Sequence, residues 1–316
     1  MESLKLSFDA ITPIFLLMLL GYVLKKLKVA DKKGFDVVNR LVFKVFLPVL
    51  LFYNIYKTET AEVFSPKLIG FTLAGILVVF VVGYFAVFGL TKDNAKRGVM
   101  LQGFFRANFA ILGVPLVGYI CGDKAGGLTS LMVAVVVPAF NILAVVALER
   151  FREGREKLKI GTLLLGIMKN PLIIGCAIGL VFFVLGIKLP GVIEESVSKV
   201  SSVASPLAII ALGAGFEFAD TKGYLKDVLV VVLARLVFIP AIILSVAVVL
   251  GFEGEALACL LITFGGPIAV SSFSMSQQMG GDEKLSAQTI VMSSALCMIT
   301  LFLWIFTFGR MGLFGV

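Results

Sequence analysis

Histidine is absent from the 316 residues of this chain. Without an imidazole there is no Ser-His-Asp or Cys-His nucleophile system and no histidine-ligated metal site. The four cysteines have no C-x-x-C spacing, and all but Cys121 lie inside apolar runs, so we interpret them as small core residues. DDxxD and GxGD motifs are missing as well. The sequence therefore predicts neither an enzyme nor a cofactor.

Charged residues are scarce, at 15% of the chain, whereas hydrophobic residues make up 59% and the mean hydropathy is +1.05. Soluble domains carry about 25% charged and roughly 45 to 50% apolar residues, so this composition indicates an integral membrane protein. The net charge of +8 is interpreted as a bias of cytoplasmic loops rather than as a nucleic-acid surface.

Long apolar runs alternate with charged or Gly/Pro-rich breaks, and each run is close to the length of about 20 residues that spans a bilayer as a helix. The runs predict ten spans, at residues 8–24, 38–56, 68–90, 98–119, 127–148, 169–187, 201–218, 228–250, 256–279 and 286–308. The first run has no basic segment before it and no A-x-A cleavage site, so we expect a retained helix rather than a signal peptide.

Lysine and arginine are distributed unequally between the two sides of these spans. Of the 28 basic residues, 18 fall in one set of alternate loops, 7 fall in the other loops and the termini, and Lys44, Arg106 and Arg235 fall within spans. Because cytoplasmic loops are enriched in Lys and Arg, residues 25–40 and 150–169 are predicted to be cytoplasmic. The predicted location is the cytoplasmic membrane, with both termini on the extracellular or periplasmic side.

The basic linker at 151–168 divides the chain into 1–150 and 169–316, each with five predicted spans. An odd number of spans gives the two parts opposite orientations, which predicts an inverted repeat. Matching residues support a duplication with an offset of 158: Pro13 and Pro48 with Pro171 and Pro206, and Gly21 with Gly179.

A Gly-x-Pro sequence stands in the fourth and in the ninth span, as Gly113-Val114-Pro115 and Gly265-Gly266-Pro267. Glycine readily ends a helix and proline suits the first turn of the next one, so both spans are predicted to break there. The offset between the two prolines is 152, which requires a six-residue indel between the repeats. A single break of this kind is more often a mere kink.

Matching breaks in two inverted halves indicate a transporter's substrate site. Two half-helix N-termini, each with roughly half a positive charge, would converge there and favour an anion.

The chain resembles the auxin efflux carrier family of permeases, which includes the plant PIN-formed carriers and is related to the bile acid/sodium symporter superfamily. The resemblance rests on ITPIFLLMLLGYVLKKLKV, NRLVFKVFLPVLLF, RANFAILGVPL and GGPIAVSSFSMSQQMGGD. Its most specific element is Asn108, seven residues before Pro115.

The resemblance implies an all-α polytopic fold of the sodium/proton antiporter type, with ten transmembrane helices in two inverted five-helix repeats. Spans 1, 2, 6 and 7 would form a scaffold domain, and spans 3–5 and 8–10 a transport domain. Spans 4 and 9 would cross at their prolines, which makes Asn108, Pro115 and Pro267 the central site. It also implies that Asn108 contacts a substrate carboxylate and leaves open a homodimer through the scaffold.

Arg106 stands two residues before Asn108, roughly 200° around an ideal helix, so both face one point only if the helix is distorted. An arginine at membrane depth suggests a functional role, although Arg106 could also extend to the cytoplasmic interface.

Other polar residues in the spans are candidates for the same site. Ser271, Ser272 and Gln277 follow Pro267 in a polar stretch that suits a substrate path or weak cation coordination, and equally helix contacts. Asn141 is a candidate pocket wall. Asn54 is either a site residue or an interfacial polar residue. With Gly113 and Gly266 these residues complete the predicted binding site.

These features predict a secondary transporter that moves a small organic carboxylate across the bilayer by an elevator-type mechanism. Neither break contains Asp or Glu, so we expect facilitated or potential-driven movement. A sodium-coupled symporter, a metabolite sensor without transport, and a channel remain alternatives.

Overall fold

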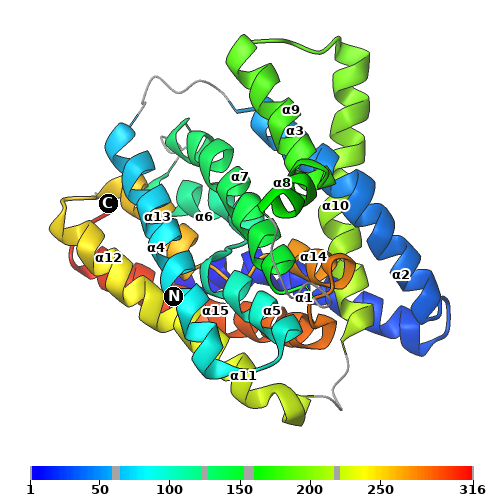
Figure 1. The fold of residues 1–316 in the computed structure, drawn as a ribbon. Coiled ribbons are helices and arrows are strands. Elements are labelled where there is room, and N and C mark those ends of the chain that lie inside the picture. The colour runs from blue at the N-terminus through cyan, green and yellow to red at the C-terminus, as the bar shows by residue number, and fades with distance from the viewer. Residues whose placement is uncertain (1, 59–64, 123–126, 153–159, 217–220, 315–316) are drawn as a thin grey trace.

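The computed structural model describes residues 2–58, 65–122, 127–152, 160–216 and 221–314, which form helices without any β-strand in these ranges (Figure 1). The first half contains α1 (Glu2–Lys26), α2 (Lys32–Leu41), the π-helical turn η1 (Val42–Phe46), α3 (Leu47–Tyr56), α4 (Pro66–Leu90), α5 (Asn94–Phe105), α6 (Phe109–Cys121) and α7 (Gly127–Arg150). The second half contains α8 (Ile160–Met168), α9 (Pro171–Leu185), α10 (Gly191–Gly215), α11 (Thr221–Leu233), the π-helical turn η3 (Ala234–Phe238), α12 (Ile239–Val249), α13 (Gly254–Gly265), α14 (Ser271–Met279) and α15 (Glu283–Arg310). Residues 153–159 of the predicted basic linker 151–168 lie outside the described residues, and its second half forms the apolar helix α8 instead of a linker.

Each of the ten predicted spans overlaps a helix or an interrupted helix, but not all of these are long enough to cross a bilayer on their own. Five helical segments of the described residues have the required length and apolar composition: Pro66–Leu90, Leu131–Arg150, Gly191–Gly215, Gly223–Val249 and Glu283–Arg310. Two shorter apolar helices are Pro171–Leu185 and Gly254–Gly265. The chain is therefore a helical multi-pass membrane protein.

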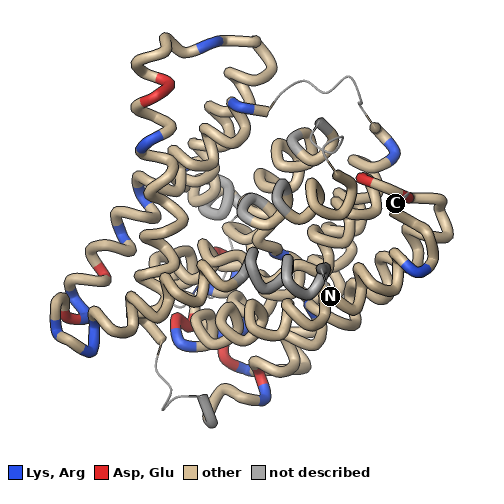
Figure 2. The backbone as a smooth tube through the Cα atoms, turned by 180° about the vertical axis from the view of Figure 1, so that it is seen from behind, with Lys and Arg blue, Asp and Glu red and all other residues tan. Residues whose placement is uncertain are grey.

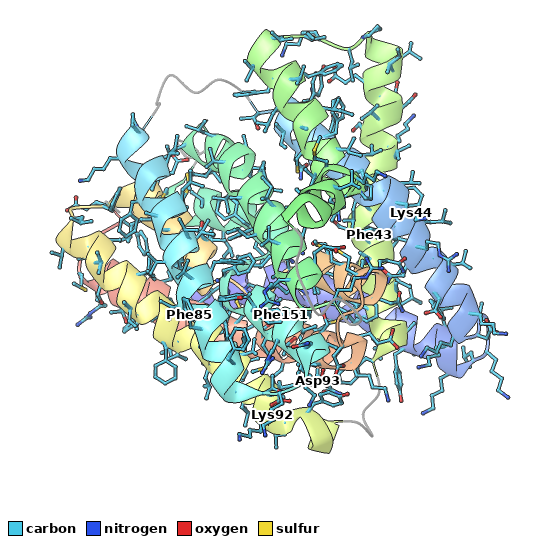
Figure 3. All side chains as sticks on the ribbon, in the orientation of Figure 1. Phe43, Lys44, Phe85, Lys92, Asp93 and Phe151 are labelled. Carbon is cyan, nitrogen blue, oxygen red and sulfur yellow. The ribbon has the colours of Figure 1, made fainter. Side chains whose placement is uncertain are left out.

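The outer surface of the helices is apolar. On α4, Leu77, Val82 and Phe85 are 54%, 63% and 68% exposed. Figure 3 labels Phe85 on this helix. Lysine, arginine, aspartate and glutamate gather at helix ends and connections, and long stretches of the helices between them carry other residues (Figure 2). Exposed leucine, valine and phenylalanine are stable against lipid tails, because no water there penalises them.

Several helices begin after a residue whose short polar side chain caps the first turn. Asp31, Asp93, Asn170 and Asp282 accept backbone N–H bonds from Gly34, Ala95, Leu172 and Leu285 at 2.8 to 2.9 Å. Each carboxylate or amide oxygen satisfies a donor that has no partner inside the first turn. These caps set where helices start at the edge of the apolar region.

Glycines allow two helix pairs, α1 with α10 and α3 with α9, to approach at backbone distance. A Cβ atom on Gly21 would lie 2.0 Å from the carbonyl oxygen of Ile210, and one on Gly179 would lie 3.0 Å from that of Phe52. The spacing of 158 residues that relates Gly21 to Gly179 also relates Phe52 to Ile210. The same contact is thus made twice, by residues at the same offset.

Two helices are interrupted, and the interruptions lie against each other. The first falls between α5 and α6, and the second between α13 and α14. Ala107 and Ile268 form an isolated antiparallel bridge. The amide of Asn108 donates to the carbonyl of Pro267 at 2.8 Å, and the amide of Ala269 donates to that of Arg106 at 3.4 Å. Each interruption therefore supplies hydrogen-bond partners for the backbone that the other one frees.

The predicted break is right for the ninth span and wrong for the fourth. Gly266 and Pro267 lie in the interruption, but Gly113 and Pro115 lie inside α6, and the fourth span breaks at 106–108 instead. The reason is that a break needs partners for its backbone, and those partners are at 267–269. The helix ends Phe105 and Gly265 are 160 residues apart, so the offset of 152 and its six-residue indel do not align the interruptions.

Candidate functional site

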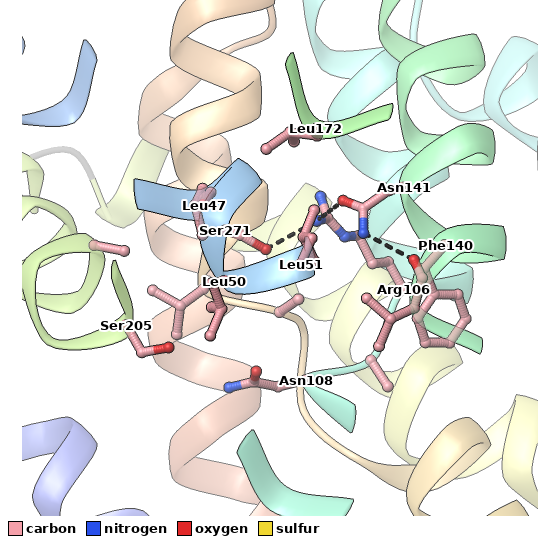
Figure 4. A pocket seen from close by; sticks show the side chains of 15 residues that line it. Leu47, Leu50, Leu51, Arg106, Asn108, Phe140, Asn141, Leu172, Ser205 and Ser271 are labelled. Atoms are coloured by element: carbon pink, nitrogen blue, oxygen red, sulfur yellow. Dashed lines mark hydrogen bonds between the residues drawn. The ribbon is translucent and has the colours of Figure 1, made fainter. Parts of the chain in front are cut away.

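A cavity of about 50 Å³ lies beside the paired interruptions (Figure 4). One wall is largely apolar and comes from α3, α9 and α10, with Leu47, Leu50, Leu51 and Leu172. The facing wall comes from 106–108, α7 and 269–271 and carries most of the polar side chains. It contains four of the predicted site residues: Arg106, Asn108, Asn141 and Ser271.

Arg106 and Asn108 both line the cavity because the chain between α5 and α6 is not helical. Arg106 has φ −90° and ψ 107°, and Asn108 has φ −82° and ψ 50°. In an extended segment, residues two apart face the same side, whereas in a helix they face different sides. Arg106 and Asn108 could face one point only if the helix was distorted there, and the structure contains that distortion.

Arg106 is 3% exposed, and its guanidinium is held by neutral groups. Nη2 donates to Asn141 Oδ1 and to Ser271 Oγ, each at 2.8 Å, and Nη1 contacts the sulfur of Met275. Asn141 is itself held in place because its Nδ2 donates to the carbonyl of Val137 at 2.8 Å. Among the described residues no carboxylate pairs with Arg106. Its positive charge is therefore uncompensated by protein groups of that part of the chain.

Two helix N-termini add to this positive potential. Asn108 is the N-cap of α6 and Val270 is the N-cap of α14, and neither side chain caps its helix. Asn108 has no side-chain hydrogen-bond partner among the described residues, and its amide group lies in the cavity (Figure 4). Each N-terminus carries roughly half a positive charge, so both add to the positive potential beside the cavity.

Gly113, Gly266, Pro267 and Ser272 are predicted site residues that do not line the cavity. The carbonyl of Gly266 accepts a bond from Arg235 Nε at 3.0 Å, and that of Pro267 accepts one from the amide of Asn108 at 2.8 Å. Gly113 is buried in α6, and the side chain of Pro115 is outside what the structure describes. Ser272 is 1% exposed, and its hydroxyl has no hydrogen-bond partner within the described ranges.

Asn54 and Gln277 lie away from the cavity. Asn54 is half-buried on α3, where its carbonyl accepts a bond from Thr58. Gln277 belongs to a group of contacts between α2 and the α14–α15 region, which we call the polar seam: Gln277 with Asn39, Asp36 and Glu283, Ser274 with Asn39, and Lys32 with Glu283.

Sequence reasoning missed two features of the site. Ser205 on α10 lines the cavity, but nothing distinguishes it from the neighbouring serines of that helix. Arg235 is completely buried beside the interruptions. Its position inside a predicted span was a usable signal, because an ionisable residue at membrane depth has a functional role by default.

Metal-binding groups and disulfides do not contribute to the described part of the site. No cluster of three or more Cys, Asp or Glu side chains is present in the described ranges. The four cysteines are unpaired, and Cys176, Cys259 and Cys297 are buried.

Comparisons with known proteins show which family the chain belongs to. A family model described as "Membrane transport protein" matches residues 6–305. An "Uncharacterized transporter" of Methanothermobacter thermautotrophicus is 24% identical over 94% of this chain and 97% of its own length. "Uncharacterized transporter YfdV" of Escherichia coli (strain K12) is 22% identical over 93% and 95%. A "Putative malonate transporter" of Rhizobium meliloti is 24% identical over 92% of both chains. The resemblance found in the sequence is confirmed: the chain belongs to the membrane transport proteins of the auxin efflux carrier family.

Proposed function

We propose that this protein is a secondary transporter that moves a small organic carboxylate across the cytoplasmic membrane and binds it at the crossed interruptions. The observation that carries the proposal is the buried guanidinium of Arg106 in the cavity wall, with neutral partners only among the described residues. Burying an unpaired charge costs several kcal/mol, and an anionic ligand offsets that cost.

The site favours a compact, strongly acidic ligand. Arg106 contributes one positive charge and the two helix N-termini contribute roughly one more, so a monoanion or dianion fits the potential. A cavity of about 50 Å³ is small, which favours short carboxylates. The malonate named for the Rhizobium meliloti relative belongs to this class and is the first ligand to test.

The repeated contact of Gly21 with Ile210 and of Gly179 with Phe52 supports two inverted repeats. Spans related by such a repeat make equivalent contacts, and the constant offset of 158 residues is what duplication leaves. In this architecture the ten helical segments are the ten spans, with both termini on the outer side.

The position of the cavity supports alternating access. Its apolar wall belongs to the helices expected to form the scaffold, and its charged wall to those expected to form the transport domain. A rigid shift of the charged wall along the apolar one would carry the anion across the bilayer in elevator fashion. With no carboxylate among the described residues of the site, the membrane potential and the anion gradient drive the movement.

Flux of labelled malonate into proteoliposomes tests the function. Wild-type protein should take up malonate or another short carboxylate from the same panel. Asn108→Ala should reduce flux strongly because it removes a polar group from the cavity, whereas Asn54→Ala, the same change outside the cavity, should leave flux unchanged. Equal flux in Asn108→Ala and Asn54→Ala contradicts the site.

Binding assays separate transport from sensing. In the presence of a bound carboxylate from the same panel, the melting temperature of wild type should rise, because a ligand of the folded state stabilises that state. Binding without flux under any gradient or potential would indicate a metabolite sensor instead.

A further inference from the structure

Arg235 joins the ends of the two interrupted helices. It lies in η3, is 0% exposed, and points its guanidinium at backbone carbonyls. Nη2 donates to the carbonyl of Thr263 at 2.6 Å and Nε to that of Gly266 at 3.0 Å. Nη1 donates to the carbonyls of Phe104 and Phe105, each at 3.3 Å. One side chain thus binds the last turn of α5 and the last turn of α13 together.

These carbonyls need a cation or donors. The last four carbonyls of a helix have no partner inside the helix, and the C-terminus carries roughly half a negative charge. Two C-termini therefore place about one negative charge inside the bilayer. Among the described residues Arg235 has no carboxylate partner, so its charge is matched by the two helix ends.

An arginine suits this position better than a lysine does. The guanidinium presents five N–H donors in a flat fork, so it can reach carbonyls on two sides, whereas an ammonium is a point charge with three donors. Arg235 lies in the π-helical turn η3, from which its side chain reaches the C-terminal ends of both α5 and α13. Such turns are frequent at functional sites.

The two buried arginines have complementary positions. Arg235 binds the carbonyl ends of α5 and α13, and Arg106, directly after α5, lines the cavity where α6 and α14 begin. If the carbonyl ends were not neutralised, their negative charge would offset the positive potential of the cavity next to them.

We infer that Arg235 is a built-in cation of the transport site: it neutralises and joins the two helix C-termini, so that the anion site beyond them forms without a bound metal ion. The inference rests on the proposed function, because binding of the anion is the quantity that the experiment measures. Arg235 is a positioning residue, because it acts on the ligand through the backbone of the interruptions. The corresponding expectation is that wild-type binding does not change when choline replaces sodium.

Chemical rescue tests this role. Wild type, Arg235→Ala and a control variant of an exposed arginine, Arg310→Ala, are compared by malonate affinity and by the melting temperature. Each is measured with guanidinium chloride or choline chloride at equal low-millimolar concentration. Arg235→Ala should bind malonate at least about tenfold more weakly, a change of about 1.4 kcal/mol. Guanidinium, but not choline, should recover part of the affinity and raise the melting temperature of Arg235→Ala alone.

Three outcomes would each overturn the inference. Arg235→Ala could bind malonate as tightly as wild type does, choline could rescue Arg235→Ala as well as guanidinium does, or wild type could require sodium for binding. If wild type binds no anion, the proposed function fails, and a rise in the melting temperature of Arg235→Ala with guanidinium alone still supports the cation role. If Arg235→Ala does not fold, Arg235→Lys decides. Its single ammonium should give a lower melting temperature and weaker binding, and wild-type values in Arg235→Lys contradict the inference.

Discussion

The two buried arginines, Arg106 and Arg235, have different hydrogen-bond partners. These partners distinguish an arginine with a structural role from one that is available to a ligand. The guanidinium of Arg235 has four carbonyl contacts. That of Arg106 has an amide, a hydroxyl and a thioether as partners. Carbonyl ends of helices carry negative charge, whereas these neutral groups do not. Arg106 is therefore the arginine that can still attract an anion.

Asn141→Asp tests this distinction at a single atom. The change keeps the size of the side chain and places a carboxylate where the amide oxygen lies 2.8 Å from Arg106 Nη2. An internal ion pair would neutralise the site, so malonate affinity should fall by about tenfold to a hundredfold, the cost of losing a charged hydrogen bond. The variant gains an ion pair but loses the bond from Asn141 Nδ2 to the Val137 carbonyl, so the melting temperature is measured to show that it folds. Asn54→Asp is the control and should bind as wild type does; unchanged affinity in Asn141→Asp contradicts a charge role for Arg106.

Helix packing in the apolar wall depends on glycines that face a neighbouring backbone. A Cβ atom on Gly213 would lie 2.0 Å from the carbonyl oxygen of Met18, closer than any real contact. Backbone cannot rotate away as a flexible side chain can, so α1 and α10 would have to separate. Close approach through small residues is how membrane helices gain packing without a hydrophobic driving force.

A graded series of Gly→Ala variants measures that packing. Gly213→Ala should destabilise the protein by about 1 to 3 kcal/mol, as overpacking does. Gly179→Ala, where the nearest atom is 3.0 Å away, should cost less. Gly70→Ala has open space around it on α4 and should be neutral or stabilising by up to about 1 kcal/mol. Thermal unfolding ranks the three, and a Gly213→Ala protein as stable as Gly70→Ala would show that α1 and α10 are not tightly packed.

At the scale of the whole molecule, the polar seam holds α2 against α14 and α15. Its contacts include Lys32 with Glu283 at 3.1 Å and Gln277 with Asp36 at 2.9 Å. The seam lies beside the residues that charge counting predicts to be cytoplasmic. If the proposed elevator movement separates α2 from α14 and α15, these contacts break, and we expect them to influence the balance between conformations.

Asn39→Ala should therefore shift the protein toward a cytoplasm-open state. It removes the bonds of Asn39 to Gln277 and Ser274. The readout is the rate at which a thiol reagent on the cytoplasmic side labels Ser205→Cys, a cavity residue, in a protein without the four native cysteines. The rate should rise in Asn39→Ala. Lys199→Ala breaks only a surface pair within α10 and should not change it; equal rates in both variants would argue that the seam is not a gate.

Prediction from the sequence worked where local residues decide and failed where distant ones do. Apolar runs located the helices to within a few residues at most ends, since length and hydropathy are local. The break at Gly266 and Pro267 was found because glycine and proline act on their own backbone. Asn54 and Gln277 were placed at the site only because they are polar and lie in a span, and the structure shows both away from the cavity.

By itself, the sequence determined that the protein lies in the bilayer, where its helices run, that no histidine chemistry occurs, and that an anion is the expected ligand. The tertiary structure decided that the fourth span breaks at Arg106–Asn108 and that these residues share a cavity with Asn141 and Ser271. The reason is physical: backbone freed inside a membrane must find partners. Those for 106–108 come from 267–269, and those for the carbonyls of Phe104 and Phe105 come from Arg235, all far along the chain.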